Sequence, residues 1–312
     1  MVNAVLMFPG QGAQKVGMGK DLAAEFPAAR ETFEAIDDAL GFSLSRLMWE
    51  GPADELTLTH NAQPAILAHS SAVHAVVGSV LASLAGAGHS LGEYSAYVAA
   101  GSLSPRDGAT LVRRRGELML EAGKVRVGTM AAVLGLATDT VEGACEGATT
   151  TDAWAVPANL NTPDQTVISG DPEAVSRAGE VCKAAGARRV QPLNVSGAFH
   201  SPLMAPARDG LAAELESVEL RDPGFPVVAN ATAEPVRNGA TAKRLLVEQL
   251  VSPVRWVGCM EQAAAIGGDG VTFVELGPGK VLAGLLKRIV EGASVVSLGT
   301  AADVNAFLET HA

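Results

Sequence analysis

A serine between two glycines is the first candidate for chemistry in this sequence. The segment Gly88-His89-Ser90-Leu91-Gly92 has the pattern Gly-x-Ser-x-Gly, with small residues typical of a strand before it and a helical run after it. In a sharp strand-to-helix turn, such a serine exposes its hydroxyl and leaves the next backbone N–H free for an oxyanion. The chain has 34 glycines, so the pattern alone could arise by chance. Its context predicts a nucleophilic Ser90.

A serine nucleophile needs a general base, and His200 is the best of six histidines. It lies in VSGAFHSPL, where a strand ends and a helix begins, and strand-end loops of α/β sheets are where such sites assemble. Five histidines are less suitable by position: His60, His69, His74, His89 and His311. A common α/β-hydrolase has its histidine after the final strand, and only His311 lies that late. The ordinary esterase order therefore fits poorly.

Arg115 is the one member of an Arg-Arg-Arg run that shares an apolar helix face, with Leu111 and Met119 at helical spacing. We expect Arg113 and Arg114 to lean instead toward glutamates farther along the helix. A buried guanidinium needs an anion, and it binds carboxylates in a bidentate fork. The sequence leaves two partners open for Arg115: an internal Asp or Glu, or the carboxylate of a substrate.

The N-terminal glycine loop, PGQGAQKVGMG, invites a dinucleotide-binding interpretation but does not support it. Lys15 stands where the fingerprint Gly-x-Gly-x-x-Gly needs its third glycine, and the Gly-Lys-Ser/Thr of a Walker loop is absent. A tight turn that places Gln11 and a backbone N–H at a sheet edge fits the residues.

Composition excludes several classes of function. The chain has 312 residues, 48% of them hydrophobic, which suits one large domain or a domain with an insert. A net charge of −11 argues against an extended nucleic-acid surface or an anionic-membrane anchor. The three cysteines share no short spacing, which predicts neither a metal site nor a disulfide framework. We expect a cytoplasmic protein with no signal peptide, no membrane span and no nucleic-acid partner.

The order of elements predicts an α/β fold with an insert. We expect a strand at 4–8 and helices at 21–40, at 63–84 with Pro64 in its first turn, and at 104–123 with Ser104 as cap and Gly123 as stop. Alternating helices and later strands at 225–231, 271–276 and 293–298 indicate a parallel sheet.

Between these two parts, the expected order is β-α-β-β-α-β, which is typical of a ferredoxin-like unit. Its elements are predicted at 128–136, 138–148, 153–161, 165–170, 172–186 and 188–195. We therefore expect an α/β catalytic subdomain formed by 1–125 and 198–312, and a small α+β subdomain at 126–197.

Eight ordered motifs carry a family resemblance. They are FPGQGAQ, NAQPAI, GHSLGEYSA, RRRGELM, NLNTPDQTVISG, VSGAFHSPLM, QLVSPVRW and ELGPGKVLAGLLKR. Together they resemble the malonyl-CoA:acyl-carrier-protein transacylases, the acyltransferases of fatty-acid and polyketide synthesis, over essentially the whole chain. The family has a hydrolase-like α/β domain with a ferredoxin-like insert, in agreement with the order of elements.

The resemblance also implies roles for individual residues. Ser90 would be the nucleophile, His200 its base, and the backbone N–H groups of Gln11 and Leu91 the oxyanion hole. Arg115 would bind the malonyl carboxylate.

The family has no acidic member of a triad, and its histidine is oriented by a main-chain carbonyl, which the resemblance places at Gln249. Gln63 and Asn159 match positions near the cleft. Phe199, before the histidine, matches the malonyl-type pattern that excludes an α-methyl branch.

The implied reaction is ping-pong transfer of malonyl from malonyl-CoA to acyl carrier protein, without a bound cofactor, and we expect a monomer. A serine hydrolase or editing thioesterase stays an alternative, as does a fatty-acid or a trans-acting polyketide role. A non-catalytic scaffold would have lost the serine, histidine or arginine. An acidic carrier protein needs a basic docking patch, for which the candidates are Lys183, Arg188, Arg189, Lys280, Lys287 and Arg288.

Overall fold

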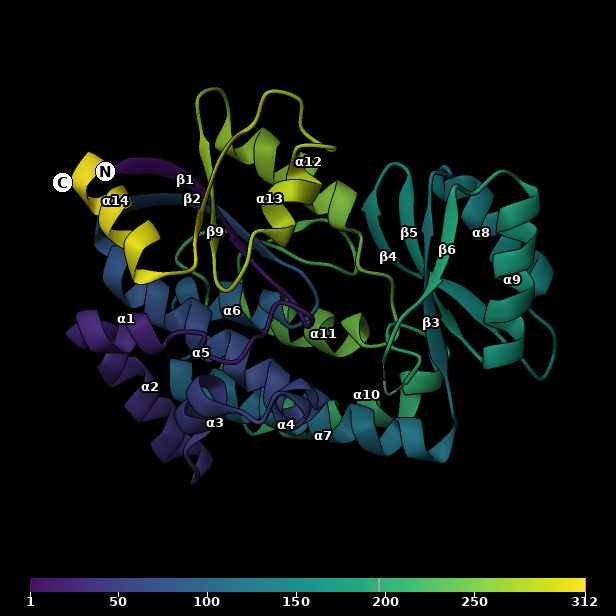
Figure 1. Cartoon of the computed structure of the whole chain (residues 1–312), viewed down its shortest axis with the longest axis horizontal. Coiled ribbons are helices and arrows are strands. Elements are labelled where there is room, and N and C mark those ends of the chain that lie inside the picture. Colours follow the sequence, from purple (N-terminus) through teal and green to yellow (C-terminus); the bar gives the residue numbers. More distant parts are fainter. Residues whose placement is uncertain (196, 312) are drawn as a thin grey trace.

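Two β-sheets lie in separate parts of the molecule (Figure 1). The computed structural model describes residues 1–195 and 197–311. The larger sheet has six strands: β1 (Val2–Phe8), β2 (Leu81–Gly88), β7 (Val227–Val228), β8 (Pro235–Val236), β9 (Thr272–Leu276) and β10 (Ser294–Leu298). Their order is β10-β9-β1-β2-β7-β8, and every pair is parallel except β7 with β8. The predicted α/β fold is confirmed.

Strand β1 is buried on both faces, because helices cover both sides of the sheet. Alternate side chains enter different apolar clusters, Leu6 and Phe8 on one face and Val5 and Met7 on the other. The first cluster is completed by α2 (Pro27–Leu40), α5 (Thr59–Val77), α6 (Gly92–Ala99), α7 (Pro105–Val125) and α14 (Ala301–His311). The second is completed by α12 (Trp256–Gly267) and α13 (Val281–Leu286).

Further elements complete this part of the chain. They are α1 (Lys20–Glu25), α3 (Leu44–Glu50), α4 (Ala53–Thr57), α10 (Ala205–Glu216), α11 (Gly239–Gln249) and 3₁₀ turns at Gly78–Val80 and Pro202–Met204. None of the helices in 1–195 and 197–311 combines the length and apolar composition needed to cross a membrane. The three cysteines are buried and free.

The small sheet is antiparallel throughout, in the order β4-β5-β3-β6. Its elements are β3 (Thr129–Leu134), α8 (Thr138–Ala148), β4 (Ala155–Thr162), β5 (Gln165–Gly170), α9 (Pro172–Ala184) and β6 (Arg189–Pro192). Both helices pack on the sheet over a core of their own, which includes Val133, Cys145, Ile168 and Cys182. This is the predicted ferredoxin-like unit. The subdomain boundaries at 126 and 197 stay a prediction.

Two predicted helices are wrong in extent. The helix expected at 21–40 is two helices, because Phe26, which precedes Pro27, is extended. The helix expected at 63–84 begins earlier, at Thr59, and ends at Val77. The small residues from Leu81 onward form β2 instead, paired with β1.

Pro64 therefore lies inside α5 and not in its first turn. Proline has no N–H to donate to the carbonyl four residues earlier. That carbonyl, of His60, instead accepts a hydrogen bond from Arg113 Nη1 at 3.1 Å. Ser104 caps α7 as expected, whereas Gly123 does not stop it. The strand expected at 225–231 is reduced to Val227–Val228.

The register of β1 and β2 fixes where a site can form. Phe8 and Gly88, the last residues of the two strands, are directly paired. The glycine loop after β1 and the serine turn after β2 consequently emerge side by side at the carboxyl edge of the sheet, where ligand sites of α/β folds form.

Candidate active site

Ser90 occupies a strained turn between β2 and α6. Its φ is 52°, in the left-handed region that residues other than glycine rarely adopt. A Cβ on Gly88 would lie 1.9 Å from the carbonyl carbon of Gly92, and one on Gly92 would lie 2.1 Å from the carbonyl oxygen of Phe8. Both glycines are thus sterically required.

Asn230, two residues after strand β7, holds this turn. Its Oδ1 accepts the backbone N–H of Ser90 at 2.8 Å, and its Nδ2 donates to the carbonyl oxygen of Gly88 at 2.8 Å. The side chain is fully buried. Asn230 was not predicted from the sequence, where its one signal is a polar residue within the apolar run FPVVANA.

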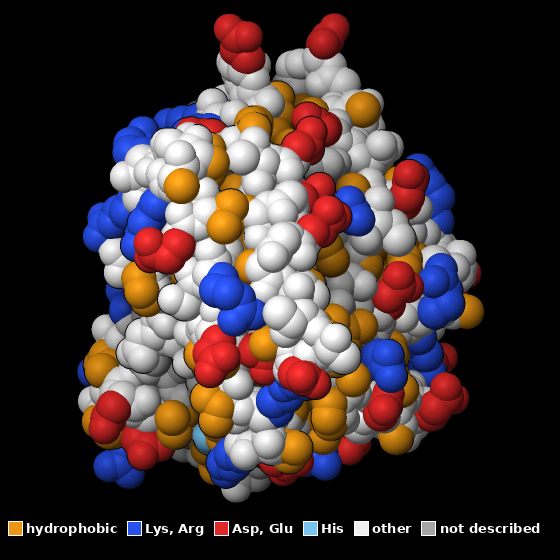
Figure 2. All heavy atoms as spheres, turned by 90° about the vertical axis from the view of Figure 1, so that its right-hand side faces the viewer, with side chains coloured by type: hydrophobic (Ala, Val, Ile, Leu, Met, Phe, Trp, Pro, Cys, Tyr) orange, Lys and Arg blue, Asp and Glu red, His pale blue; other side chains and the backbone are white. Residues whose placement is uncertain are grey.

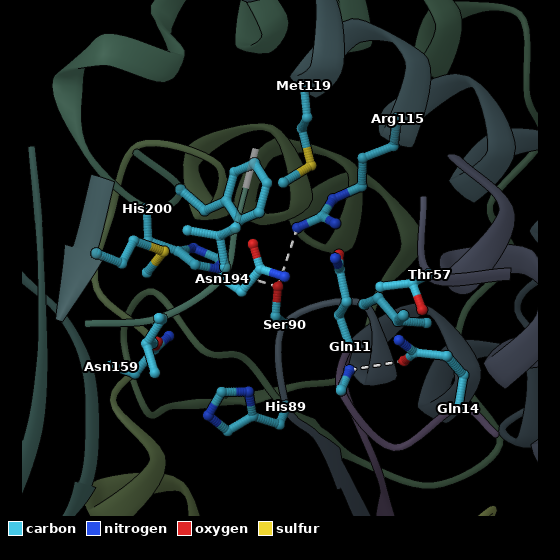
Figure 3. Close-up of a pocket in the computed structure, with 16 residues that line it drawn as sticks. Gln11, Gln14, Thr57, His89, Ser90, Arg115, Met119, Asn159, Asn194 and His200 are labelled. Atoms are coloured by element: carbon cyan, nitrogen blue, oxygen red, sulfur yellow. Dashed lines mark hydrogen bonds between the residues drawn. The ribbon is translucent and has the colours of Figure 1, made fainter. Parts of the chain in front are cut away.

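His200 lies beside the serine hydroxyl, with Nε2 at 2.8 Å from Ser90 Oγ (Figure 3). Its Nδ1 lies 2.9 Å from the main-chain oxygen of Gln249. Because a carbonyl can only accept, Nδ1 carries the proton and Nε2 is free to accept from the serine. Burial, and secondly the charge of Arg115, lowers the pKa of His200 to about 3. The imidazole is therefore neutral at physiological pH.

Arg115 is buried, with 1% of its surface exposed, and its partners are uncharged. Nη1 donates to Gln63 Oε1 at 2.6 Å, while Nη2 donates to Gln249 Oε1 at 2.9 Å and to Ser90 Oγ at 3.2 Å. Within 1–195 and 197–311, Nε has no hydrogen-bond partner and no carboxylate forms an ion pair with this guanidinium. The sequence left two partners open for Arg115, an internal acid or a substrate carboxylate. In the described residues, no internal Asp or Glu pairs with it.

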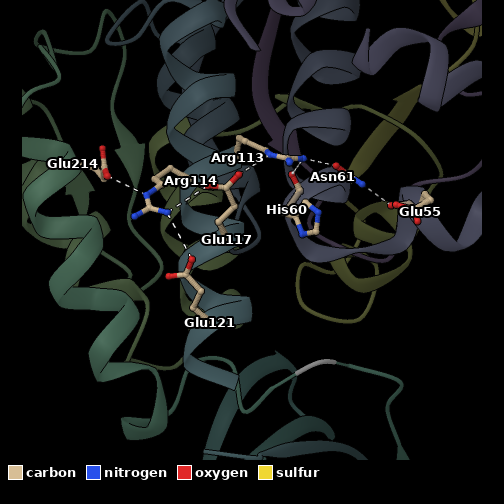
Figure 4. Close-up of polar contacts among 8 residues, drawn as sticks. All are labelled: Glu55, His60, Asn61, Arg113, Arg114, Glu117, Glu121 and Glu214. Carbon is tan, nitrogen blue, oxygen red and sulfur yellow. Dashed lines mark hydrogen bonds and ion pairs between the residues drawn. The ribbon is translucent and has the colours of Figure 1, made fainter. Parts of the chain in front are cut away.

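The other two arginines of the run behave as expected (Figure 4). Arg113 Nε pairs with Glu117 at 2.9 Å. Arg114 pairs with Glu117 at 3.4 Å and Glu121 at 4.0 Å, and also with Glu214 of α10 at 3.0 Å. Only Arg115 is turned inward.

The glycine loop after β1 packs directly against the serine turn. A Cβ on Gly10 would lie 2.6 Å from the carbonyl oxygen of His89. Among the described residues, no hydrogen bond uses the backbone N–H of Gln11 or of Leu91, and both residues line the same pocket as Ser90. Two free N–H donors next to a serine suit an oxyanion.

These groups open into a pocket of about 440 Å³ (Figure 3). Of the predicted site residues, seven line it: Gln11, Ser90, Leu91, Arg115, Asn159, Phe199 and His200. Gln63 and Gln249 lie behind Arg115, fully buried. His89 also lines the pocket, but its Nε2 is engaged by Asn161 Oδ1 at 2.9 Å.

Glu93, in the first turn of α6, is a further buried group that was not predicted from the sequence. Its Oε2 accepts from Gln249 Nε2 at 2.7 Å and from the backbone N–H of Asn230 at 3.0 Å. Burial raises the pKa of its carboxyl to about 7. Gln249 thus links Arg115 and Glu93 through its carboxamide while its main chain holds His200.

Comparison with known proteins decides the family. Residues 5–311 match the family described as acyl transferase domain. The chain belongs to this family. Malonyl CoA-acyl carrier protein transacylases from Bacillus subtilis and Escherichia coli K12 are 43% and 44% identical to it. Each alignment covers 99% of this chain, with 98% of the Bacillus and 100% of the Escherichia protein.

Solved structures agree with this acyltransferase over nearly its whole length. An acyl carrier protein S-malonyltransferase from Vibrio cholerae superposes with a TM-score of 0.94 at 41% identity, covering 98% of this chain and 99% of that one. A malonyl transacylase in complex with a type II PKS acyl carrier protein gives 0.93 at 42% identity, with 98% and 99% covered. The expected resemblance to malonyl-CoA:acyl-carrier-protein transacylases is confirmed.

Proposed function

We propose that this acyltransferase moves a malonyl group from malonyl-CoA to the phosphopantetheine thiol of an acyl carrier protein, through an ester on Ser90. One arrangement carries the proposal: Ser90 Oγ contacts both the neutral imidazole of His200 and the buried guanidinium of Arg115. The first contact suits a nucleophile and its base. The second places a cation without an internal acid beside the acyl group, as a malonyl carboxylate requires.

In the first half-reaction, His200 Nε2 takes the hydroxyl proton as Ser90 Oγ attacks the thioester carbonyl. The oxyanion points at the N–H groups of Gln11 and Leu91, each worth about 3 kcal/mol in the transition state. The C–S bond then breaks, and the departing thiolate of CoA receives the proton from His200. Malonyl is left as an ester on Ser90.

In the second half-reaction, the phosphopantetheine thiol gives its proton to His200 and its sulfur attacks the ester carbonyl. The same two N–H groups hold the oxyanion. When the C–O bond breaks, Ser90 Oγ regains its proton from His200. The nucleophile, the base and the oxyanion donors in these steps all belong to this chain, and the proposal includes no bound cofactor besides the two thioester substrates.

Acyl selectivity is assigned to two walls of the pocket. Arg115 pairs with the malonyl carboxylate, and an acetyl group would leave that buried cation without an anion. Phe199 lines the pocket next to the histidine and limits the space for an α-methyl branch. Asn159 also lines this pocket.

The carrier-protein partner is supported by the solved malonyl transacylase complex with its own carrier protein. Docking needs positive charge, and the candidate basic residues are not equivalent. All six are exposed, but Lys183 is paired with Glu180 and Arg288 with Asp164. Among the described residues, no ion pair engages the other four, which are Arg188, Arg189, Lys280 and Lys287. On the face of the small subdomain, basic and acidic side chains are intermixed (Figure 2). The cytoplasmic location and the monomeric state stay predictions.

Mass spectrometry of the intact protein after exposure to malonyl-, methylmalonyl- and acetyl-CoA tests this function. We expect a malonyl adduct on Ser90, a much smaller yield of the other two adducts, and no adduct on the Ser90→Ala variant. Addition of holo acyl carrier protein should then move the malonyl group to the carrier thiol. Release of free malonate at the same rate with and without the carrier would instead indicate a thioesterase.

A further inference from the structure

The buried guanidinium of Arg115 is held by carboxamides rather than by carboxylates. Gln63 Oε1 accepts from Nη1 and Gln249 Oε1 accepts from Nη2. Among the described residues, the carboxylate of Glu93 makes no direct hydrogen bond or ion pair with this cation. Gln249 lies between the two, and its Nε2 donates to Glu93 Oε2 at 2.7 Å. The order along this chain of contacts is guanidinium, carboxamide, carboxylate.

We propose that Gln63 and Gln249 determine acyl specificity, as a neutral cradle that keeps Arg115 oriented and free of any internal carboxylate. This inference deepens the proposed function and rests on it. A carboxylate bonded directly to a guanidinium makes a stronger, charge-assisted pair than an amide oxygen does. An internal acid at either position would compete with the acyl carboxylate for the same N–H groups, whereas an amide oxygen orients them and leaves the charge available.

Burial makes this arrangement consequential. Gln63, Gln249 and Glu93 have no exposed surface, and Arg115 has 1%. Charges in such buried surroundings are weakly screened. A carboxylate that contacts Arg115 directly would therefore pair with it much more strongly than one that lies a side chain farther away. Glu93 favours the charged form of Arg115 from a distance, against the effect of burial. Because the carboxamide of Gln249 lies between them, the carboxylate of Glu93 stabilises the cation of Arg115 without pairing with it directly.

The Gln63→Glu variant tests the cradle at one side of the guanidinium. Glutamate keeps the shape and places a carboxylate on Nη1; the lost Nε2 donor served only Met119 Sδ, at 3.3 Å. We expect the ratio of kcat/KM for malonyl-CoA to that for acetyl-CoA to fall about 100-fold, mainly through a higher KM for malonyl-CoA. Gln63→Met is the matched control. It removes the acceptor without adding charge, so the ratio should change by less than about tenfold.

The exchange variant Glu93→Gln/Gln249→Glu tests the other side. It preserves net charge and side-chain shapes, and the main-chain oxygen that orients His200 is unchanged. The order is reversed, because the carboxylate now contacts Arg115 and the amide takes the place of Glu93. The hydrogen bond from Gln249 Nε2 to the main-chain oxygen of Ser90, at 3.0 Å, is lost as well. We expect the same collapse of the malonyl-to-acetyl ratio. Glu93→Gln alone, which leaves the guanidinium without a direct acid, should keep the ratio within about tenfold of wild type.

Transfer is measured to holo acyl carrier protein, with circular dichroism as the check of folding. A wild-type protein that transfers no malonyl refutes the proposed function itself. A wild type that prefers malonyl, with Gln63→Glu or the exchange variant folded and equally selective, refutes the cradle alone. Equal losses of malonyl and acetyl transfer in these variants would also overturn the proposal, because they indicate a purely structural role. The two variants alter different elements, so either one suffices if the other does not fold.

Discussion

The imidazole of His200 is oriented by a main-chain oxygen, that of Gln249, which lies 2.9 Å from Nδ1. A carbonyl provides direction but no full negative charge. The neighbouring charged side chain is the cation Arg115, which disfavours a second positive charge. The imidazole is therefore held in place without being made more basic, and the acid–base behaviour of His200 follows from this.

The pH profile of malonyl transfer should reflect the lowered pKa of His200. The base works in its neutral form, which is lost only as pH falls through the folded pKa of about 3. Between pH 8 and pH 5, kcat/KM for malonyl-CoA should therefore show no decrease centred near pH 6.5, the ordinary pKa of a histidine. The pKa of Glu93, about 7, falls inside this range, so the profile is measured in Glu93→Gln as well. A midpoint near 6.5 that persists in that variant would contradict the assignment.

Replacement of Arg115 should separate malonyl from acetyl transfer. In Arg115→Ala the malonyl carboxylate loses its partner, and kcat/KM for malonyl-CoA should fall by about 100- to 1000-fold. Acetyl transfer should fall far less. The neighbouring Arg114→Ala is the control, since Arg114 is half-exposed and pairs with Glu214 at the surface. Equal losses for both acyl groups in Arg115→Ala would remove the carboxylate-binding role.

The serine turn should not tolerate a methyl group at its second glycine. In Gly92→Ala the new Cβ would lie 2.1 Å from the carbonyl oxygen of Phe8, so the free energy of unfolding should fall by about 3 kcal/mol or more. Gly143→Ala in α8 is the control. Its Cβ meets nothing within 4 Å, and alanine should stabilise the helix by about 0.5–1 kcal/mol. Urea denaturation measures both; a Gly92→Ala protein of wild-type stability would contradict the close packing.

The buried carboxyl of Glu93 should make stability depend on pH. Its pKa is about 7 in the folded protein and 4.5 in the reference state. Between these values the unfolded chain has released a proton that the folded protein retains, so this group lowers the free energy of unfolding as pH rises, by about 3 kcal/mol.

Glu93→Gln removes this dependence. The Tm of the variant minus that of the wild type should therefore increase from pH 5 to pH 8. The other ionisable groups that interact with Glu93 are Arg115, Tyr94, Tyr97 and Cys259. Burial raises the pKa of both tyrosines and of the thiol, and Arg115 stays charged, so none titrates in this range. A Tm difference that is constant with pH would exclude a titrating Glu93.

Charge reversal at Lys280 and Lys287 should weaken binding of the carrier protein selectively. Both are exposed, and no ion pair engages them in the described part of the chain. We expect the double variant Lys280→Glu/Lys287→Glu to raise the KM for holo acyl carrier protein several-fold while that for malonyl-CoA is unchanged. Arg46→Glu/Arg244→Glu, at exposed positions on α3 and α11, makes the same change in net charge and is the control. If the KM for the carrier protein is unchanged in the double variant, the carrier protein docks on another surface.

Residues with a local signature could be found from the sequence. Ser90 stands in a glycine pattern, His200 at a strand end, and Arg115 on the apolar face of a helix, so each signal spans only a few neighbours. Asn230, Glu93 and the side chain of Gln249 have no such signature. Asn230 meets Ser90 across 140 positions, and Gln249 meets Glu93 across 156. Their roles depend on tertiary contacts that no local window contains.

The fold shows the same division. The alternation of helices and strands was readable, and so was the β-α-β-β-α-β unit, because each element carries its own periodicity. The first half of strand β2, residues 81–84, was misread as the end of a helix. The residues of β2, LASLAGAG, have neither a two-residue nor a helical period, and their extended form comes from pairing with β1. The local preference of this segment was overridden by pairing with β1, which lies far away in the sequence.

At position 249 the main chain contacts His200 and the side chain contacts Arg115, and this has an evolutionary consequence. The carbonyl that directs His200 is present whatever amino acid the codon specifies, whereas the carboxamide next to Arg115 can be exchanged by mutation. Acyl preference can therefore drift at this position while the proton-transfer apparatus is inherited intact. New thioester specificities are open to such a scaffold without passing through an inactive ancestor.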